Sequence, residues 1–443
     1  MRAFKMFLLA AAAMAALNAQ ATDFQVGVDG PRNVVRGHAL YLGVMVTNIV
    51  GTDTQMVTPS ISGLPAGMTA NWLSMQFYCC GTKLAALQTS DSLMLQVAST
   101  TRTGRYGLLV KLTTDGGVAR STLITVNVWD SFPMVTPAGS YPADVPLTDL
   151  GAWQTNMTTL GQQYCFASGS TYTDPWFYDG SRAYYQIADY TGSTSWNACA
   201  VAQRNVYRPY VQAHNGSVQG FEVFAEGLLM DYQRSGDTIS RDAVGLLFAN
   251  EAYVHPTPPS WVIANATGWL YSREISFALN ASLANERMGN PRSPDLPVLV
   301  EMLIGDFDQW FLSKRATYVQ PFMVALAAES LIAYNETTPD PRIPYLLKTA
   351  ADALRANSWD ATVQGFRYEN GDGTTLQVAD ENLLIAPLYG WVYRYTGDVK
   401  YRTWGDEAFN GGVAWGIYSG KFFTLSYRWS GKYVEWRQKP AGF

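Results

Sequence analysis

One recurring unit occupies the last two thirds of the chain and most constrains how it can fold. Each unit has an apolar helical stretch ending in an aromatic residue, a tight polar turn and a second amphipathic helical stretch. The turns contain Gly192, Gly236, Gly289 and Gly397. Their spacing exceeds the ~34 residues of a tetratricopeptide unit and suits longer helical hairpins. Because each hairpin must bury its apolar face against a neighbour, we expect five or six hairpins in a closed ring or an open solenoid.

The preceding part of the chain has the two-residue period of β-strands. Apolar and polar residues alternate over Ala39–Val46 and Ser121–Val128, and glycine-containing turns separate such runs. About 100 residues of short strands favour a two-sheet sandwich. A segment with four prolines then interrupts any regular element. We therefore predict an all-β sandwich over 22–130, a proline-rich linker over 131–147 and an all-α domain over 148–443.

The first 21 residues have the pattern of a secretory signal peptide. Arg2 and Lys5 precede the apolar run Met6–Leu17, and Ala19-Gln20-Ala21 resembles a cleavage site. We expect a secreted or periplasmic protein. The apolar run is too short to span a membrane, and no later stretch reaches about 20 apolar residues, so no membrane span is expected.

The cysteines fit an exported protein, in which disulfides can form. Cys165 and Cys199 flank the first helical segments of the second part, where a bridge could join them, although the sequence leaves the pairing open. Cys79 and Cys80 are adjacent, and separate thiols or contacts elsewhere are equally open because a bridge between neighbours is strained.

Composition and missing motifs exclude several functions. The chain has 31 basic and 36 acidic residues, a net charge of -5, so a nucleic-acid partner is not expected. It lacks a G-x-S-x-G elbow, a phosphate-binding G-x-x-x-x-G-K-[ST] loop and an H-E-x-x-H zinc motif. With only three histidines, we expect neither a multi-histidine metal site nor a cofactor. The absence of an Asp-Asp pair argues against a terpene cyclase.

Two parts of the sequence resemble known families. The helical unit, with turns such as Tyr395-Thr396-Gly397-Asp398, resembles the (α/α) toroid glycosidases and polysaccharide lyases, including unsaturated glucuronyl hydrolases. Residues Gly63–Met68 and Thr103–Gly107 resemble bacterial immunoglobulin-like modules. An immunoglobulin-like domain ahead of a toroid is similar to the arrangement of certain secreted endoglucanases. The resemblance implies an (α/α)5-6 toroid acting on a polysaccharide or oligosaccharide.

Polar residues gather at the predicted starts of the first helix of each hairpin. If these helices are the inner ones, their N-terminal ends meet on one face of the ring. Glycoside hydrolysis needs two carboxyl groups, one as acid and one as base or nucleophile. Our candidate pair is Asp179 and Glu274, with Glu222 and Asp380 in reserve. Each of these acids also has a plain alternative as a helix cap or ion-pair partner.

Other side chains near the same helix starts would bind the sugar. Arg182 and Arg273 would orient the carboxylates or bind an acidic sugar. Aromatic side chains provide flat apolar platforms, although aromatic residues at helical spacing are more often part of a core. The further candidate binding residues are Trp176, Tyr178, Tyr271, Gln320, His214 and Tyr427.

Two alternatives to hydrolysis remain. A polysaccharide lyase would use a tyrosine or histidine as base beside an arginine, for which His214, Tyr271, Arg273 and Tyr427 are available. A non-catalytic glycan- or protein-binding repeat protein would instead have an aromatic, neutral face. The acidic segment around Asp306 falls late in an outer helix, and we expect it to be structural and ion-paired to Lys314 or Arg315.

Overall fold

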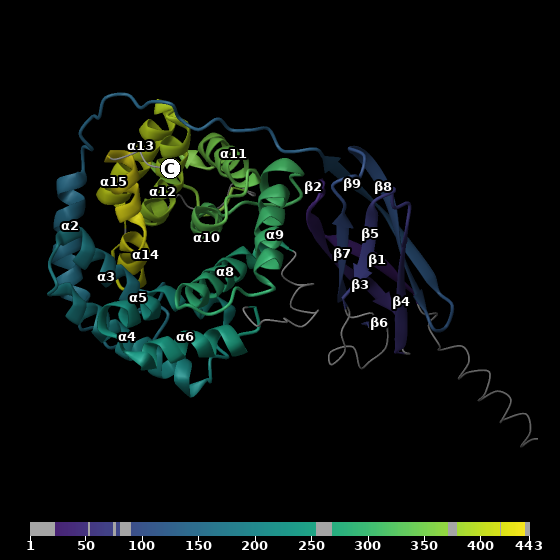
Figure 1. The fold of residues 1–443 in the computed structure, drawn as a ribbon, viewed down its shortest axis with the longest axis horizontal. Coiled ribbons are helices and arrows are strands. Elements are labelled where there is room, and N and C mark those ends of the chain that lie inside the picture. Colours follow the sequence, from purple (N-terminus) through teal and green to yellow (C-terminus); the bar gives the residue numbers. More distant parts are fainter. Residues whose placement is uncertain are drawn as a thin grey trace, which may run out of the picture. The chain divides into compact units, whose positions relative to one another are not determined.

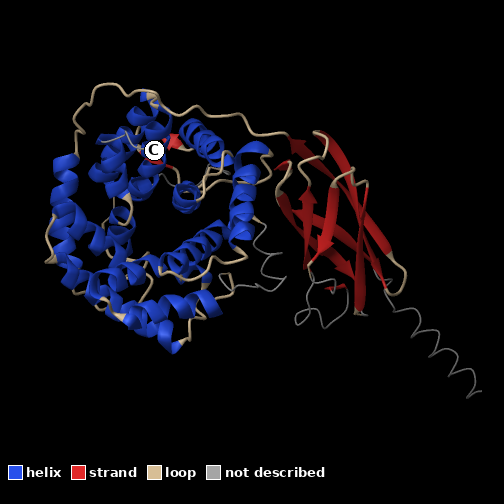
Figure 2. Cartoon of the chain, viewed as in Figure 1, coloured by secondary structure: helices blue, strands red, loops and turns tan. Residues whose placement is uncertain are grey.

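The computed structural model describes residues 23–51, 54–73, 77–79, 90–253, 268–370, 379–416 and 418–438. The predicted signal peptide, Cys80 and His255 lie outside these ranges. The chain divides into two compact units: among the described residues, the first contains 23–130 together with Gly268, and the second contains the remainder. A β-rich first part and a helical second part, as the sequence predicts, are confirmed (Figure 2).

The first unit contains two β-sheets. One has the strand order β1-β3-β7-β5 and the other β2-β9-β8-β4-β6. All described pairings are antiparallel except β2 with β9. The strands are β1 (Asp23–Asp29), β2 (Asn33–Val35), β3 (Ala39–Val50), β4 (Gln55–Ser62), β5 (Met68–Trp72), β6 (Phe77–Cys79), β7 (Ser90–Val97), β8 (Gly104–Thr114) and β9 (Ala119–Trp129).

Alternating side chains explain why these sheets pack face to face. On β8, Leu108, Val110 and Leu112 are fully buried while Lys111 is exposed. Leu42 on β3 joins the same hydrophobic cluster from the other sheet. A strand that buries every second side chain against a facing sheet forms one layer of a sandwich. The two-residue period in the sequence therefore corresponds to a single core between two sheets.

The second unit is built of helical hairpins. Helices of the outer layer are α2 (Leu150–Tyr164), α4 (Trp196–Ala213), α6 (Thr238–Asn250), α9 (Leu296–Phe307), α11 (Arg342–Asn357) and α13 (Val399–Trp415). Those of the inner layer are α3 (Gly180–Thr191), α5 (Ala225–Ser235), α8 (Ser272–Arg287), α10 (Pro321–Thr337), α12 (Asn382–Thr396), α14 (Lys421–Tyr427) and α15 (Ser430–Gln438). The inner helices α8, α10 and α12 are buried almost all round, which explains their continuous apolar sequences.

The inner helices contact one another in a closed succession. α3 packs on α5, α5 on α8, α8 on α10, α10 on α12, and α12 on α14 and α15. α14 then contacts α3, so the succession returns to its beginning (Figure 1). Because an outer helix separates successive inner helices along the chain from α3 to α14, these inner helices run in one direction. Their N-terminal ends therefore share one side of the helical unit.

Two segments differ in detail from simple hairpins. The last helical segment is interrupted at Arg428 and Trp429 and so forms two helices, α14 and α15. Residues 131–148 contain no helix or strand. They nevertheless pack on the helical unit, because the hydroxyl of Tyr141 donates to the Arg394 carbonyl at 2.5 Å and the Ala138 amide donates to the Tyr395 carbonyl at 2.7 Å.

In the described part of the chain, no helix has both the length and the apolar character to cross a bilayer.

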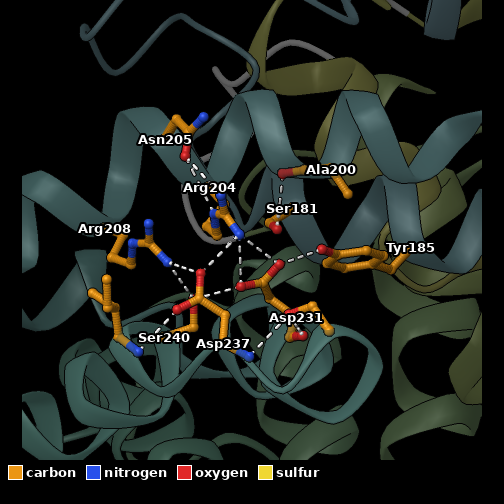
Figure 3. Close-up of polar contacts among 11 residues, drawn as sticks. Ser181, Tyr185, Ala200, Arg204, Asn205, Arg208, Asp231, Asp237 and Ser240 are labelled. Carbon is orange, nitrogen blue, oxygen red and sulfur yellow. Dashed lines mark hydrogen bonds and ion pairs between the residues drawn. The ribbon is translucent and has the colours of Figure 1, made fainter.

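A buried ionic network joins both layers near α5. Asp231 on α5 is fully buried, and its carboxylate accepts hydrogen bonds from Arg204 on α4 at 2.9 Å, from Tyr185 on α3 at 2.5 Å and from Ser240 on α6 at 2.5 Å (Figure 3). A buried carboxylate needs such a full set of donors. The network therefore fixes how the inner and outer layers meet in this sector.

Cys165, just after α2, and Cys199, in α4, form a disulfide across a sequence separation of 34 residues. Closing a loop of this length in the unfolded chain stabilises the folded state by about 3–4 kcal/mol.

We expect dithiothreitol to lower the free energy of unfolding by about that amount, measured by urea denaturation. The matched control is the double variant Cys165→Ser/Cys199→Ser. Without reductant it should have the same free energy of unfolding as the reduced wild-type protein, and dithiothreitol should not change that value. Equal stability of the oxidised and reduced protein would contradict this prediction.

Candidate active site

Asp179 precedes α3 and connects two inner helices. Its carboxylate accepts the backbone N–H of Arg182 at 3.2 Å and that of Gly227, in the first turn of α5, at 2.9 Å. Tyr178 and Asp179 both have left-handed backbone angles, with φ of 64° and 72°. Burial raises the pKa of Asp179 to about 6, opposed by the charges of Arg182 and Arg428. Strained non-glycine residues of this kind cluster at functional sites.

A buried ion-pair network lies beside Asp179. Glu329, in the middle of α10, pairs with Arg182 on α3 and with Arg428 between α14 and α15, the latter at 3.0 Å. All three side chains are at most about one tenth exposed. Arg182, a predicted sugar-binding residue, is therefore ion-paired to a buried carboxylate that connects three inner helices.

The first turn of α8 supplies a second ion pair. Arg273 contacts Glu274 at 2.8 Å, and its guanidinium lies 5.1 Å above the ring of Phe221. The guanidinium also contacts the hydroxyl of Tyr178. The other oxygen of Glu274 is buried and has no hydrogen-bond partner among the residues that the structure describes. Glu274 thus has one oxygen held by Arg273 and one unpaired.

The 3-10 turn Ala379–Glu381, just before α12, contributes two buried acids. Burial raises the pKa of Glu381 to about 8, the adjacent charge of Asp380 adds to the rise, and Lys421 opposes it. Burial also raises the pKa of Asp380. At neutral pH Glu381 is therefore mostly protonated, which is the state that a proton donor requires. The sequence analysis placed Asp380 at a helix start as a reserve acid and did not select Glu381.

Tyr178 interacts with Arg273 in the first turn of α8 and with Glu381 just before α12. Burial and the charge of Glu381 raise its pKa, and Arg273 lowers it. Tyr368 also interacts with Glu381 and Arg273, and its ring stacks on Phe322 at 5.3 Å. The starts of α3, α8 and α12 thus meet around Tyr178. We call Tyr178, Arg273, Glu274, Tyr368 and Glu381 the polar centre.

Asp306 near the end of α9 is an acid whose environment the sequence did not predict. Its side chain is fully buried, and neither carboxylate oxygen has a hydrogen-bond partner within the described ranges. The prediction of an ion pair with Lys314 or Arg315 is therefore wrong for Asp306. Burial raises its pKa well above the usual range, and the charge of Glu274 adds to the rise. Asp306 therefore lies near Glu274 of the polar centre.

Other predicted residues lie apart from the polar centre or on its border. Tyr427 is buried and its hydroxyl donates to the Trp153 carbonyl at 3.0 Å, so it packs α14 on α2. His214 is exposed, with Nδ1 2.9 Å from the Tyr210 carbonyl. Tyr271 is 37% exposed and stacks on Tyr253. Gln320 is half-buried and donates to Glu369, the neighbour of Tyr368, at 3.5 Å.

Glu222 and Trp176 instead line a separate cavity of about 350 Å³. One oxygen of Glu222 accepts the hydroxyl of Tyr210 at 2.6 Å. Gly220, two residues earlier, lies so close to Glu274 that a Cβ there would meet its Cγ at 2.9 Å. The cavity therefore adjoins the polar centre through the turn Gly220–Glu222. Within the part of the chain that the structure covers, no group of three histidine, cysteine or acidic side chains could hold a metal ion.

The chain has only distant similarity to the known proteins reported below. No family model matches the chain, and no curated protein matches it. A family 76 glycoside hydrolase from a bovine Bacteroides thetaiotaomicron strain aligns over 89% of this chain and 78% of its own, at 11% identity and a TM-score of 0.30. A conjugative transposon lipoprotein from Bacteroides eggerthii aligns over 24% of this chain and 96% of its own, at 12% identity and a TM-score of 0.19. Similarity at these TM-scores carries no argument about fold or function.

Proposed function

We propose that this protein is an exported glycoside hydrolase that cleaves a polysaccharide or oligosaccharide, in which an immunoglobulin-like sandwich precedes an (α/α) toroid. The closed succession of inner helices supports the toroid. The predicted signal peptide supports export.

The observation that carries the proposal is the contrast between two carboxyl groups of the polar centre. Glu381 is buried and has a pKa of about 8, whereas Glu274 is ion-paired to Arg273 at 2.8 Å. Glycoside hydrolysis needs one protonated and one charged carboxyl group, and different environments for two acids are how enzymes assign these roles. Glu381 would protonate the leaving glycosidic oxygen. Glu274 would act as base or nucleophile.

The remaining groups fit a supporting role. Tyr178 and Tyr368 would place apolar ring surface and hydroxyl groups beside the sugar. Asp179, predicted as the catalytic partner of Glu274, accepts two backbone N–H groups, and we propose that it positions Tyr178 at the start of α3. Asp380 would keep the proton on Glu381 through its charge. No cofactor is needed for this reaction.

A polysaccharide lyase is the second candidate, because Tyr178 lies beside Arg273 as a lyase base would. That base must lose its proton, and burial together with the charge of Glu381 raises the pKa of Tyr178. The raised pKa favours hydrolysis over elimination.

The test is to incubate the purified protein with neutral and acidic polysaccharides and follow reducing ends and ultraviolet absorbance together. We expect new reducing ends without the absorbance of an unsaturated uronate, and a loss of at least 100-fold in Glu274→Gln. The matched control is Glu435→Gln, whose side chain is 55% exposed and, among the residues that the structure describes, pairs with Lys432. Absorbance rising with reducing ends would show a lyase, whereas binding without any product would show a non-catalytic protein.

A further inference from the structure

The cavity beside the polar centre is lined mainly by aromatic side chains. Tyr172, Trp176, Tyr207 and Tyr210 surround it with aromatic rings, and Glu222 is the acidic side chain that reaches it. Trp176 and Tyr207 are buried and stack with ring centroids 5.9 Å apart. The volume of about 350 Å³ lies at the lower end of the range for small-molecule pockets. The cavity is therefore an aromatic cage with a single carboxyl group.

Glu222 differs in its partners from Asp231 and Glu329, two other buried carboxylates of the helical unit. Asp231 and Glu329 are each paired with arginine. The carboxylate of Glu222 instead accepts the hydroxyl of Tyr210 at 2.6 Å and, more weakly, the backbone N–H of Gln219 at 3.4 Å. Tyr172 also contacts it. Among the described residues no basic side chain pairs with Glu222, although it is only 1% exposed.

The charge of such a carboxylate is left for a ligand to neutralise. Burial of an unpaired charge is costly, and hydrogen bonds from neutral phenols compensate only part of it. Aromatic faces attract cations, and cages of tyrosine and tryptophan are a recurring way to bind substituted ammonium groups. A protonated amine satisfies both features, since it pairs with the carboxylate and lies against the rings. A neutral hydroxyl group in the same place leaves the charge uncompensated.

We infer that this cavity binds the protonated amino group of a hexosamine unit. The turn that carries Glu222 touches Glu274 through Gly220, so the bound unit would lie next to the sugar being cleaved. The inference thus names a de-N-acetylated, glucosamine-containing glycan as the substrate class, and in that part it rests on the proposed function. The binding of the amine itself depends only on the cavity.

The experiment is calorimetric titration of the full-length Glu381→Gln variant, which should not turn over substrate. The probes are glucosamine, N-acetylglucosamine, glucose and ethanolamine. We expect glucosamine to bind at least tenfold more tightly than each of the other three. Similar binding of glucosamine and glucose would overturn the role of the charge. Similar binding of glucosamine and ethanolamine would overturn the role of the sugar ring.

Two further variants locate the site. Introducing Glu222→Gln into the Glu381→Gln variant should remove the preference for glucosamine over N-acetylglucosamine. The glutamine amide keeps the shape of the glutamate side chain but carries no charge. Tyr172→Leu, at a ring 52% exposed and therefore tolerant of change, should weaken glucosamine binding severalfold with unchanged circular dichroism. A preference that survives both substitutions would overturn the assignment.

The two proposals fail separately. Hydrolysis of neutral glycans by a protein that shows no amine preference would refute only the cavity assignment. Glucosamine binding that depends on Glu222, in a protein without hydrolytic activity on any glycan, would refute only the proposed function.

Discussion

Replacing Glu381 with glutamine is expected to abolish hydrolysis and, at the same time, to stabilise the protein at alkaline pH. An amide cannot donate the proton that a leaving oxygen needs, and loss of general acid catalysis typically lowers the rate 10²- to 10⁴-fold. The substitution keeps the shape of the side chain. The rate of reducing-end release, compared with that of Glu435→Gln, measures the first effect.

The stability effect follows from where Glu381 holds its proton. Its pKa is about 8 in the folded protein against an ordinary value of 4.5, so the folded state binds one more proton than the unfolded state between these pH values. The free energy of unfolding therefore falls as pH rises through that window. The loss amounts to at most about 5 kcal/mol above pH 8, at about 1.4 kcal/mol per pH unit.

Glu381→Gln removes this pH dependence. In urea denaturation the variant should match the wild-type protein near pH 4.5 and be more stable by a few kcal/mol at pH 8. A stability difference between variant and wild-type protein that is the same at both pH values would contradict the raised pKa of Glu381.

Replacing Glu329 with glutamine is expected to lower the free energy of unfolding by about 3–5 kcal/mol. The variant leaves Arg182 and Arg428 buried without their shared counter-charge. Urea denaturation at pH 7 measures the effect. The matched control is Asp242→Asn, which breaks an exposed pair with Arg241 and should change stability by less than about 1 kcal/mol. A loss below about 1 kcal/mol in Glu329→Gln would show that the network tolerates two unpaired arginines.

The fold was the more predictable part because periodicity reports directly on burial. The sequence changes from a two-residue period to apolar helical stretches where the strands end and the helical hairpins begin. The turn glycines lie between the two helices of a hairpin. Gly192, Gly236 and Gly397 have positive φ angles at the ends of α3, α5 and α12, where glycine is favoured. The interruption of the last helix at Arg428 had no such signal, because no proline or glycine precedes it.

The starts of the inner helices were predictable from the sequence, but the roles of the acids at them were not. Helix starts can be read from the sequence, and they placed Asp179, Glu274 and Asp380 on one side of the helical unit. Which acid keeps its proton depends on burial and on neighbours far away along the chain. Burial and the charge of Asp380 together raise the pKa of Glu381. The charge of Glu274 acts on Asp306 in an outer helix, an interaction that no local pattern shows.

The final helices close the ring on segments translated long before them. Tyr427 binds the carbonyl of Trp153 across 274 positions, and Thr424 binds that of Pro175 across 249. Contacts of such high contact order form late and slow the folding reaction. A nascent chain that lacks α14 cannot complete the inner layer, so its apolar helices stay open to aggregation until α14 has been synthesised. We therefore expect the helical unit to complete its fold only after α14 has been synthesised.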